Sequence, residues 1–448
     1  MKKMLTTLSA LLMALFTLSA QSNNEITYKG LAPHRSEFVT YSTRNAADKG
    51  NRAAEKYYID LTKHLKMQGY SEAGHLISIY EVEIPLLWRD RVTFLHTEGG
   101  QAERLVRVNG RVVGESRDNR APSEFDISRF IRDGVTRIEI INPKQSDERP
   151  AEMVADHPTV DQLFLYSQPP IRIHDVIVSA KPDKGRKHGE LKMQVVVGAS
   201  VDKDDKVSVG YDIYSPEKEL KYYDVREMEL SGIGLDTLSF ETNIYGAMER
   251  LWSAESPKLY DVTLYVKRGG IILEYLKLKV GFGDTTYADG KIYRNGTPVE
   301  IKAANYNSAS TAKQTSTDLK ALKKRGINTI YPDYPQPYWF YDLCDELGLY
   351  IIEQPNINTD PKDGDRSRKG TLANNPKWLG DFLERAKASY FRVRNHPSII
   401  GWSLGGPSGG GYNMYKCYEW FKEWEQERPI VYRDGDWNSD LELPAPIE

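Results

Sequence analysis

The chain has 448 residues, of which 40% are hydrophobic and 27% are charged, and its formal net charge is −3. This length allows two to four domains of ordinary size, and the composition is that of a globular protein with a buried core. The small negative balance gives no basic surface for nucleic acid and no cluster of cations that would hold the chain on a membrane.

The first twenty residues have the pattern of a secretory signal peptide. Two lysines precede an apolar stretch over 5–18, and the small residues Ser19 and Ala20 follow it. The stretch is too short to cross a bilayer as a helix, and no other stretch could span one. We therefore expect residues 1–20 to be removed and the mature protein to be exported, to the periplasm or outside the cell, without a membrane anchor.

Two all-β regions follow the signal peptide. In residues 21–168, hydrophobic residues alternate along 77–84 and 92–96, and a later strand runs into the turn Asn109–Gly110. Two adjacent prolines end this region, and a second set of short strands covers 169–283. Turns that recur every eight to twelve residues or so are typical of β-sandwiches, and we predict that the second region is immunoglobulin-like.

From residue 284 to 448 strands alternate with helices. The expected helices cover Thr317–Lys324, with its first residue as N-cap, Trp339–Leu347 and Pro376–Arg392, and the clearest buried strand is Ser398–Leu404. This alternation predicts a parallel sheet of five strands from a (β/α)8 TIM barrel, which needs eight strands to close.

The two cysteines give no metal site. Cys344 and Cys417 both fall in helix-like patterns, and no cluster of Cys and His has the spacing of a zinc site. We expect two buried free thiols, with a disulfide bond as the alternative.

The stretch Arg394–Asn413, RNHPSIIGWSLGGPSGGGYN, places a buried strand before a glycine-rich loop, where β/α barrels have their chemistry. It resembles the NHPSIIxWSLGNESG motif of glycoside hydrolase family 2, the β-galactosidase family. Blocks at 123–142 and 251–266 resemble other family segments in the same order. The resemblance implies an N-terminal sugar-binding-like jelly-roll β-sandwich, an immunoglobulin-like β-sandwich and an incomplete TIM barrel.

The same motif lacks the side chains that the family uses for catalysis and for one sugar contact. Pro407 stands at the position of the family's general acid/base, and Gly406 replaces the asparagine that contacts the sugar. The family's nucleophile lies on a later strand, beyond Glu448. Because retaining hydrolysis needs two carboxylates about 5–5.5 Å apart, the resemblance implies a β-galactosidase-like pseudoenzyme of carbohydrate metabolism, inactive as a hydrolase, that at most binds a glycan.

The remaining candidates for substrate binding lie at the ends of the barrel strands, and they are Asn305, Tyr331, Glu353, Gln354, Asn356 and Trp402. Glu353 and Asp333 are weak candidates for a catalytic carboxylate. For each of these residues a structural role is the alternative, since a lone acid is as often structural and a tryptophan inside a strand is usually part of the core.

The family's metal site also fails to match. In β-galactosidases a glutamate, a histidine and the acid/base help to hold a magnesium ion, and here these positions are Asn358, Asp360 and Pro407. Since Mg²⁺ needs several oxygens in an octahedral array, we predict no bound metal there and no cofactor.

Two other functions remain open. One is an active O-glycosyl hydrolase, of the β-galactosidase or β-glucuronidase type, with a relocated carboxylate pair drawn from Glu353, Asp333 and Asp360. The other is a non-enzymatic assembly module. A five-strand arc exposes two parallel edges and half of an apolar interior, so we also expect an oligomer or a separately encoded continuation of the barrel.

Overall fold

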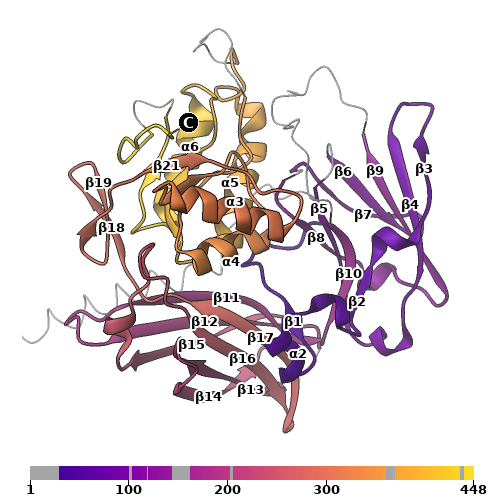
Figure 1. Cartoon of the computed structure of the whole chain (residues 1–448). Coiled ribbons are helices and arrows are strands. Elements are labelled where there is room, and N and C mark those ends of the chain that lie inside the picture. The colour runs from indigo at the N-terminus through magenta and orange to yellow at the C-terminus, as the bar shows by residue number, and fades with distance from the viewer. Residues whose placement is uncertain are drawn as a thin grey trace, which may run out of the picture.

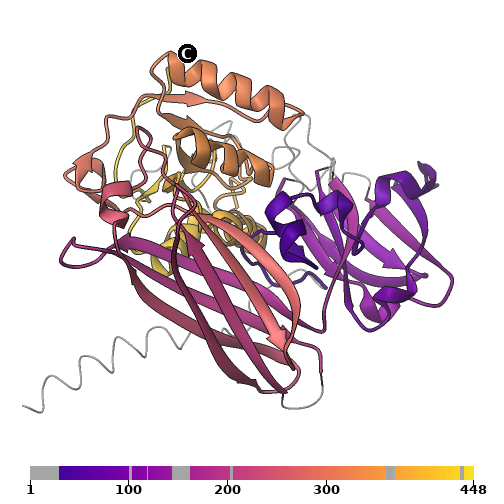
Figure 2. The same cartoon turned by 60° about the horizontal axis from the view of Figure 1, so that its bottom comes forward.

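The computed structural model describes residues 30–99, 103–118, 120–143, 162–201, 205–359, 367, 369–433 and 438–447. The expected signal peptide and Asp360 lie outside these ranges. Within them, no helix is both long and apolar enough to cross a membrane. Two β-sandwiches and one α/β unit make up the described chain, and the α/β unit packs against both sandwiches (Figures 1 and 2). This arrangement confirms the predicted fold class.

The first sandwich consists of two antiparallel sheets. One has the strand order β2 (Tyr58–Asp60), β10 (Gln162–Gln168), β5 (Val92–Glu98), β8 (Ser123–Asp126). The other has the order β3 (Leu65–Tyr70), β4 (Leu76–Glu83), β9 (Val135–Asn142), β6 (Arg104–Val108), β7 (Arg111–Ser116). Their inner faces bury alternate residues such as Leu95, Val106 and Leu165 in one core.

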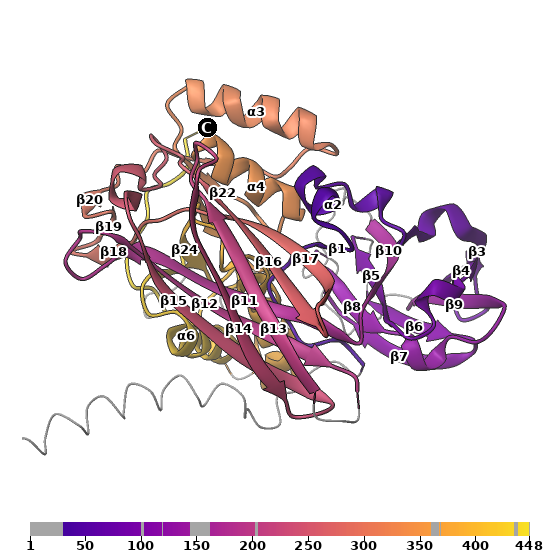
Figure 3. The same cartoon turned by 90° about the horizontal axis from the view of Figure 1, so that it is seen from below.

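The second sandwich has a three-stranded sheet of β11 (Ile171–Pro182), β12 (Gly189–Ala199) and β15 (Gly234–Ile244). Its other sheet has the order β1 (Thr40–Tyr41), β17 (Ile271–Val280), β16 (Tyr260–Arg268), β13 (Asp205–Tyr214), β14 (Leu220–Leu230). The alternation in β13 buries Val207, Val209 and Ile213 on one face. Figure 3 shows that helix α2 (Arg44–Lys49), which follows the edge strand β1, lies between the two sandwiches.

The α/β unit has five parallel strands, in the order β21 (Ala303–Asn305), β22 (Thr329–Tyr331), β23 (Tyr350–Glu353), β24 (Ile399–Ser403), β25 (Ile430–Val431). Its helices are α3 (Ala312–Lys324), α4 (Tyr338–Leu347), α5 (Leu379–Val393) and α6 (Tyr412–Trp424). The short strands β18 (Thr285–Ala288), β19 (Lys291–Arg294) and β20 (Thr297–Pro298) precede it. Ile330, Ile351 and Ile399 face the helices, so this side of the sheet forms the main core.

Local details of the helices differ from the sequence-based predictions. Helix α3 begins at Ala312, because the extended Thr311 caps it by accepting a hydrogen bond from the Gln314 amide. The prediction of Thr317 as N-cap is therefore wrong, and its hydroxyl bonds the Lys313 carbonyl inside the helix. Both cysteines are buried free thiols, as predicted.

The inner face of the sheet is covered, so the expectation of an exposed apolar interior is wrong. Inner residues such as Ile352 and Ile400 pack against Leu441 and Leu443 of the segment 438–447. This segment crosses the arc from one edge strand to the other. The Asp440 amide donates to the Ile430 carbonyl at 2.7 Å, and the Ile447 amide donates to the Ala303 carbonyl at 2.7 Å.

Asp440 holds the covering segment in place. Its carboxylate accepts hydrogen bonds from the Ile430 amide (2.8 Å), the Tyr418 hydroxyl (2.7 Å) and the Lys422 ammonium (3.1 Å). We expect Asp440→Ala to lower the free energy of unfolding of the α/β unit by about 2–3 kcal/mol, because buried donors lose their acceptor. Urea unfolding followed by tryptophan fluorescence measures the loss. Glu442→Ala, an exposed neighbour in the same segment, is the control, and an equal effect of the two variants would contradict the role of Asp440.

Candidate functional site

A row of polar side chains crosses the carboxyl edge of the parallel sheet. The Asn307 amide donates to Asp333 Oδ2 at 2.7 Å, and the Asp333 backbone amide donates back to Asn307 Oδ1 at 3.0 Å. Gln354 Nε2 donates to the Asp333 carbonyl at 2.7 Å, and the Ser403 hydroxyl donates to Gln354 Oε1 at 3.2 Å. The four residues follow or end four neighbouring strands, β21 to β24, so the row presents amide, hydroxyl and carboxylate groups along one edge.

The side chain of Gln336 supports this polar row through hydrogen bonds. It is fully buried, and its Oε1 accepts a hydrogen bond from the Ser308 amide at 2.7 Å. Its Nε2 donates to Asn307 Oδ1 at 3.1 Å and to the Tyr334 carbonyl at 2.6 Å. The loops after β21 and β22 are therefore held by one amide. Sequence reasoning missed Asn307 and Gln336, although both stand just after predicted strand ends.

The first sandwich closes one side of the edge. Asn356 Nδ2 donates to Asp118 Oδ1 at 3.0 Å, and the Arg120 guanidinium lies 4.1 Å from the centre of the Tyr334 ring. Asp118 Oδ1 also accepts the Arg120 amide at 2.9 Å. Asp118 and Arg120 belong to a different domain and stand more than 200 positions from their barrel partners, so no spacing in the sequence indicated them.

The other predicted site residues occupy three different environments. Asn305 is exposed at the end of β21. Tyr331 is buried on the inner face, where its hydroxyl donates to the Pro444 carbonyl at 3.3 Å and burial raises its pKa to about 12. Trp402 is fully buried among the helices, and its Nε1 donates to Glu425 Oε2 at 2.9 Å. For Trp402 the structure shows the core position that was the alternative.

Glu353 points away from the polar row. Its side chain is fully buried toward the helices, where Oε1 accepts hydrogen bonds from the Tyr341 hydroxyl (2.9 Å) and the Ser389 hydroxyl (3.1 Å). Its Oε2 has no hydrogen-bond partner among the described residues. Burial raises the pKa of this carboxyl to about 7, although both hydroxyls and the charge of Arg392 act in the opposite direction. The Glu353 side chain therefore lies on the helix side of β23, and the polar row lies elsewhere at the carboxyl edge.

The glycine-rich loop after β24 carries no acid at the family's acid/base position. The Pro407 carbonyl accepts the Thr359 amide at 3.1 Å, and the Gly406 amide donates to the Ile357 carbonyl at 2.7 Å. Of the family's magnesium positions, Asn358 offers only a neutral amide and Pro407 has no ligand atom on its side chain, while Asp360 is outside the described residues. These donors do not fit a magnesium ion, which prefers carboxylates.

Comparisons with known proteins agree with this architecture. The model of "Glycosyl hydrolases family 2" matches residues 171–282, and that of "Glycosyl hydrolases family 2, TIM barrel domain" matches residues 301–444. A beta-galactosidase of Priestia megaterium is 30% identical over 402 residues, covering 81% of this chain and 37% of that protein. A beta-galactosidase of Streptococcus thermophilus is 29% identical over 383 residues, covering 80% of this chain and 36% of that protein.

Solved structures show the same fold. The Bacteroides uniformis beta-glucuronidase superposes with a TM-score of 0.68 at 16% identity, over 90% of this chain and 52% of that one. The Parabacteroides merdae beta-glucuronidase superposes with a TM-score of 0.67 at 18% identity, over 83% of this chain and 51% of that one.

The chain belongs to glycoside hydrolase family 2. Within that family it is β-galactosidase-like, because the curated relatives described above are beta-galactosidases. It spans about a third of the length of the curated relatives it matches, 37% and 36% of those two proteins.

The buried Glu353 generates a prediction about pH. With a pKa of about 7 in the folded state and 4.5 as its ordinary value, the native protein holds this proton at pH values where the unfolded chain has released it. The free energy of unfolding therefore falls as the pH rises from about 4.5 to about 7. Glu353→Gln removes this term, and we expect it to stabilise the protein by up to about 3 kcal/mol at pH 8 and by almost nothing at pH 4.

Thermal unfolding at pH 4, 6 and 8 measures the effect. The exposed Glu300→Gln is the matched control and should change stability equally at all three pH values. A Glu353→Gln variant that is less stable than the parent at pH 8 would contradict the buried, proton-retaining carboxyl.

Proposed function

We propose that this chain binds a carbohydrate at the carboxyl edge of its parallel sheet without hydrolysing it. The observation that carries the proposal is the polar row from Asn307 to Ser403 at the carboxyl ends of the parallel strands, where β/α barrels have their sites, together with Pro407 at the position that the resemblance assigns to the acid/base. Sugar hydroxyls both donate and accept hydrogen bonds, and the amides and carboxylate of the row offer both kinds of group.

The proposed ligand is a β-linked sugar. The relatives and structural neighbours are named beta-galactosidases and beta-glucuronidases, so a β-galactoside and a β-glucuronide are the two classes to test first. Gln354 is central in the proposal, because it joins Asp333 to Ser403 and is itself half-buried. Asp333 is exposed beside it and presents its carboxylate to solvent.

The proposed loss of hydrolysis follows from which carboxylates are present and where they lie. Proline has no proton to give to a leaving group, and cleavage with retention needs a second carboxylate at short range. Of the carboxylates considered for a relocated pair, Asp333 stands at the edge and Glu353 is hydrogen-bonded to Tyr341 and Ser389 on the helix side. A relocated pair that includes Glu353 would need this carboxylate to leave both hydroxyls and cross the sheet.

We further propose that the protein is exported, to the periplasm or outside the cell, on the pattern of residues 1–20. An oligomer or a separately encoded continuation of the barrel is the partner that two parallel edge strands would suit. The assembly module is the alternative function, although the segment 438–447 already hydrogen-bonds the edge strands β21 and β25.

Binding and cleavage can be measured on the same preparation. Isothermal titration with a β-galactoside and a β-glucuronide should give saturable binding for at least one, and the nitrophenyl derivatives should release no nitrophenol above the blank. We expect Gln354→Ala to weaken binding about tenfold or more, the loss of roughly one or two hydrogen bonds. Gln426→Ala, an exposed glutamine beyond α6, should bind like the parent.

Two results would overturn the proposal. Turnover that Asp333→Asn abolishes would identify an active hydrolase. No binding of any glycan on an array, together with a stable oligomer in solution, would favour the assembly module.

A further inference from the structure

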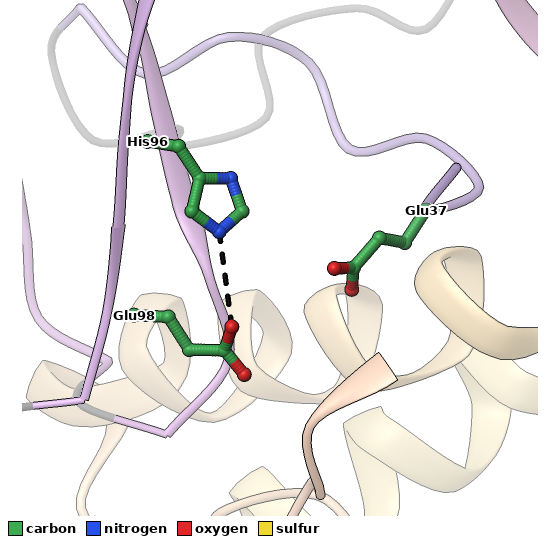
Figure 4. A group of neighbouring side chains, drawn as sticks. All are labelled: Glu37, His96 and Glu98. Carbon is green, nitrogen blue, oxygen red and sulfur yellow. Dashed lines mark ion pairs between the residues drawn. The ribbon is translucent and has the colours of Figure 1, made fainter. Parts of the chain in front are cut away.

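A buried group of two carboxylates and an imidazole lies where the first sandwich meets the α/β unit. Glu37 comes from the N-terminal segment, and His96 and Glu98 come from β5 (Figure 4). One ligand-type atom from each residue lies within 4.8 Å of the others. The exposed fraction is 3% for His96 and 5% for Glu98. This group is separate from the polar row and has no part in the proposed carbohydrate binding.

His96 is oriented by a third carboxylate. Its Nδ1 lies 3.3 Å from Glu124 Oε1, and Glu124 is fixed by the Tyr166 hydroxyl (2.7 Å) and the Arg35 guanidinium (2.9 Å). In the tautomer with its hydrogen on Nδ1, that hydrogen points at Glu124 and Nε2 keeps a lone pair. This is the arrangement in which protein carboxylates prepare histidine ligands for metals.

The lone pair on Nε2 faces another electron-rich atom. His96 Nε2 and Glu98 Oε2 are 3.8 Å apart, and neither has a hydrogen-bond partner among the described residues. This distance is too long for a hydrogen bond. Two ligands of one tetrahedral zinc ion, with bonds of about 2.0–2.2 Å, lie roughly 3.4 Å apart, so a small rotation of either side chain gives the separation that a shared ion requires.

Arg392 leaves the facing oxygens free. The guanidinium of this α5 residue bonds Glu37 through Oε2 and Glu98 through Oε1, the latter at 3.4 Å, so each carboxylate keeps its second oxygen. Three carboxylates, Glu37, Glu98 and Glu124, meet in this buried place, and the guanidinium groups that act on them are those of Arg392, Arg35 and Arg52. His96 Nε2 and Glu98 Oε2 still have no hydrogen-bond partner among the described residues, and one ion would bind both atoms.

We propose that Glu37, His96 and Glu98 bind a divalent transition-metal ion of the zinc class. One imidazole nitrogen with two carboxylate oxygens is a donor set for Zn²⁺ and its neighbours, whereas Mg²⁺ and Ca²⁺ prefer oxygen alone. A cavity of about 50 Å³ lies beside the group and is lined by Glu37, His96, Glu124 and Arg392. The ion connects the N-terminal segment to β5. Arg392 of α5 bonds the same two carboxylates, so α5 is held in the same group.

A second group of the same composition serves as a contrast. Asp342, Asp345 and His396 also lie within 4.8 Å of one another. There the Asp345 carboxylate already accepts the Ser398 amide at 3.0 Å and faces His396 Nδ1 at 2.7 Å. Its carboxylate oxygens are satisfied by the protein, so this second group carries no metal proposal.

The test uses the full chain, freed of metal with a chelator and then titrated with ZnCl₂ against a chromophoric zinc indicator. We expect one ion per chain and a rise in the unfolding temperature that depends on zinc concentration. His96→Gln and Glu98→Gln should each weaken binding at least tenfold and abolish the zinc-dependent rise. His34→Gln is the matched control, because His34 lines the same cavity and contacts Glu384 at 2.6 Å without belonging to the group.

The unsubstituted protein gives an independent measurement that needs no variant to fold. Co²⁺ in place of Zn²⁺ should give the intense visible absorption of a four- or five-coordinate ion, and one equivalent of Zn²⁺ should remove it. Saturable binding that His96→Gln and Glu98→Gln leave unchanged would overturn the assignment of ligands. The absence of stoichiometric binding in the unsubstituted chain would overturn the site and leave a proton as the cation that His96 carries.

Discussion

The arrangement of the three units depends on the end of α5. Arg392 Nη1 donates to the Gln336 carbonyl at 2.6 Å, and its other nitrogens bond Glu37 of the N-terminal segment and Glu98 of the first sandwich. These two carboxylates raise the pKa of the Arg392 guanidinium above its ordinary value, against the opposing effect of burial. A buried charge of this kind is stable only if every partner stays in place, so one side chain fixes the sandwich, the helix and the loop that supports the polar row.

The next residues of the same helix end hold the second sandwich. Arg394 Nη2 bonds Asp175 Oδ2 at 2.5 Å, and the Asn395 side chain donates to the Val176 carbonyl at 2.7 Å while accepting the Val178 amide at 3.0 Å. His396 then bonds Asp345 of α4 at 2.7 Å. The segment that resembles the family motif most closely is therefore the segment that docks the domains. Packing between the domains therefore accounts for Arg394, Asn395 and His396 in this segment.

The candidate site also separates residues that pack from residues that face the edge of the sheet. Glu353 occupies a strand end where an acid could serve chemistry, yet its hydrogen bonds go to Tyr341 and Ser389 in the helix layer. The polar row, in contrast, is assembled from loops, and neutral amides provide most of its groups. An edge of this kind offers hydrogen-bonding groups to hydroxyls, and Asp333 is the carboxylate that the row carries among the described residues.

The sequence by itself determined the order of the domains, the parallel five-stranded sheet and the substitution at Pro407, and it favoured two free thiols over a disulfide bond. Each of these conclusions follows from a local hydrophobic period, from turn residues or from one position of a recognisable motif. It did not determine the cap of α3: the sequence-based prediction was Thr317, and only the backbone angles identify Thr311, six positions earlier, as the cap.

Only the tertiary structure decided which side of β23 receives Glu353, what covers the inner face, and which residues meet across domains. Asp118 reaches Asn356, Glu98 reaches Arg392, and the segment near Leu441 reaches the sheet interior through contacts between parts of the chain that share no sequence period. Such contacts are fixed by the packing of whole domains, since a hydrogen bond depends on distance in space and not on separation along the chain.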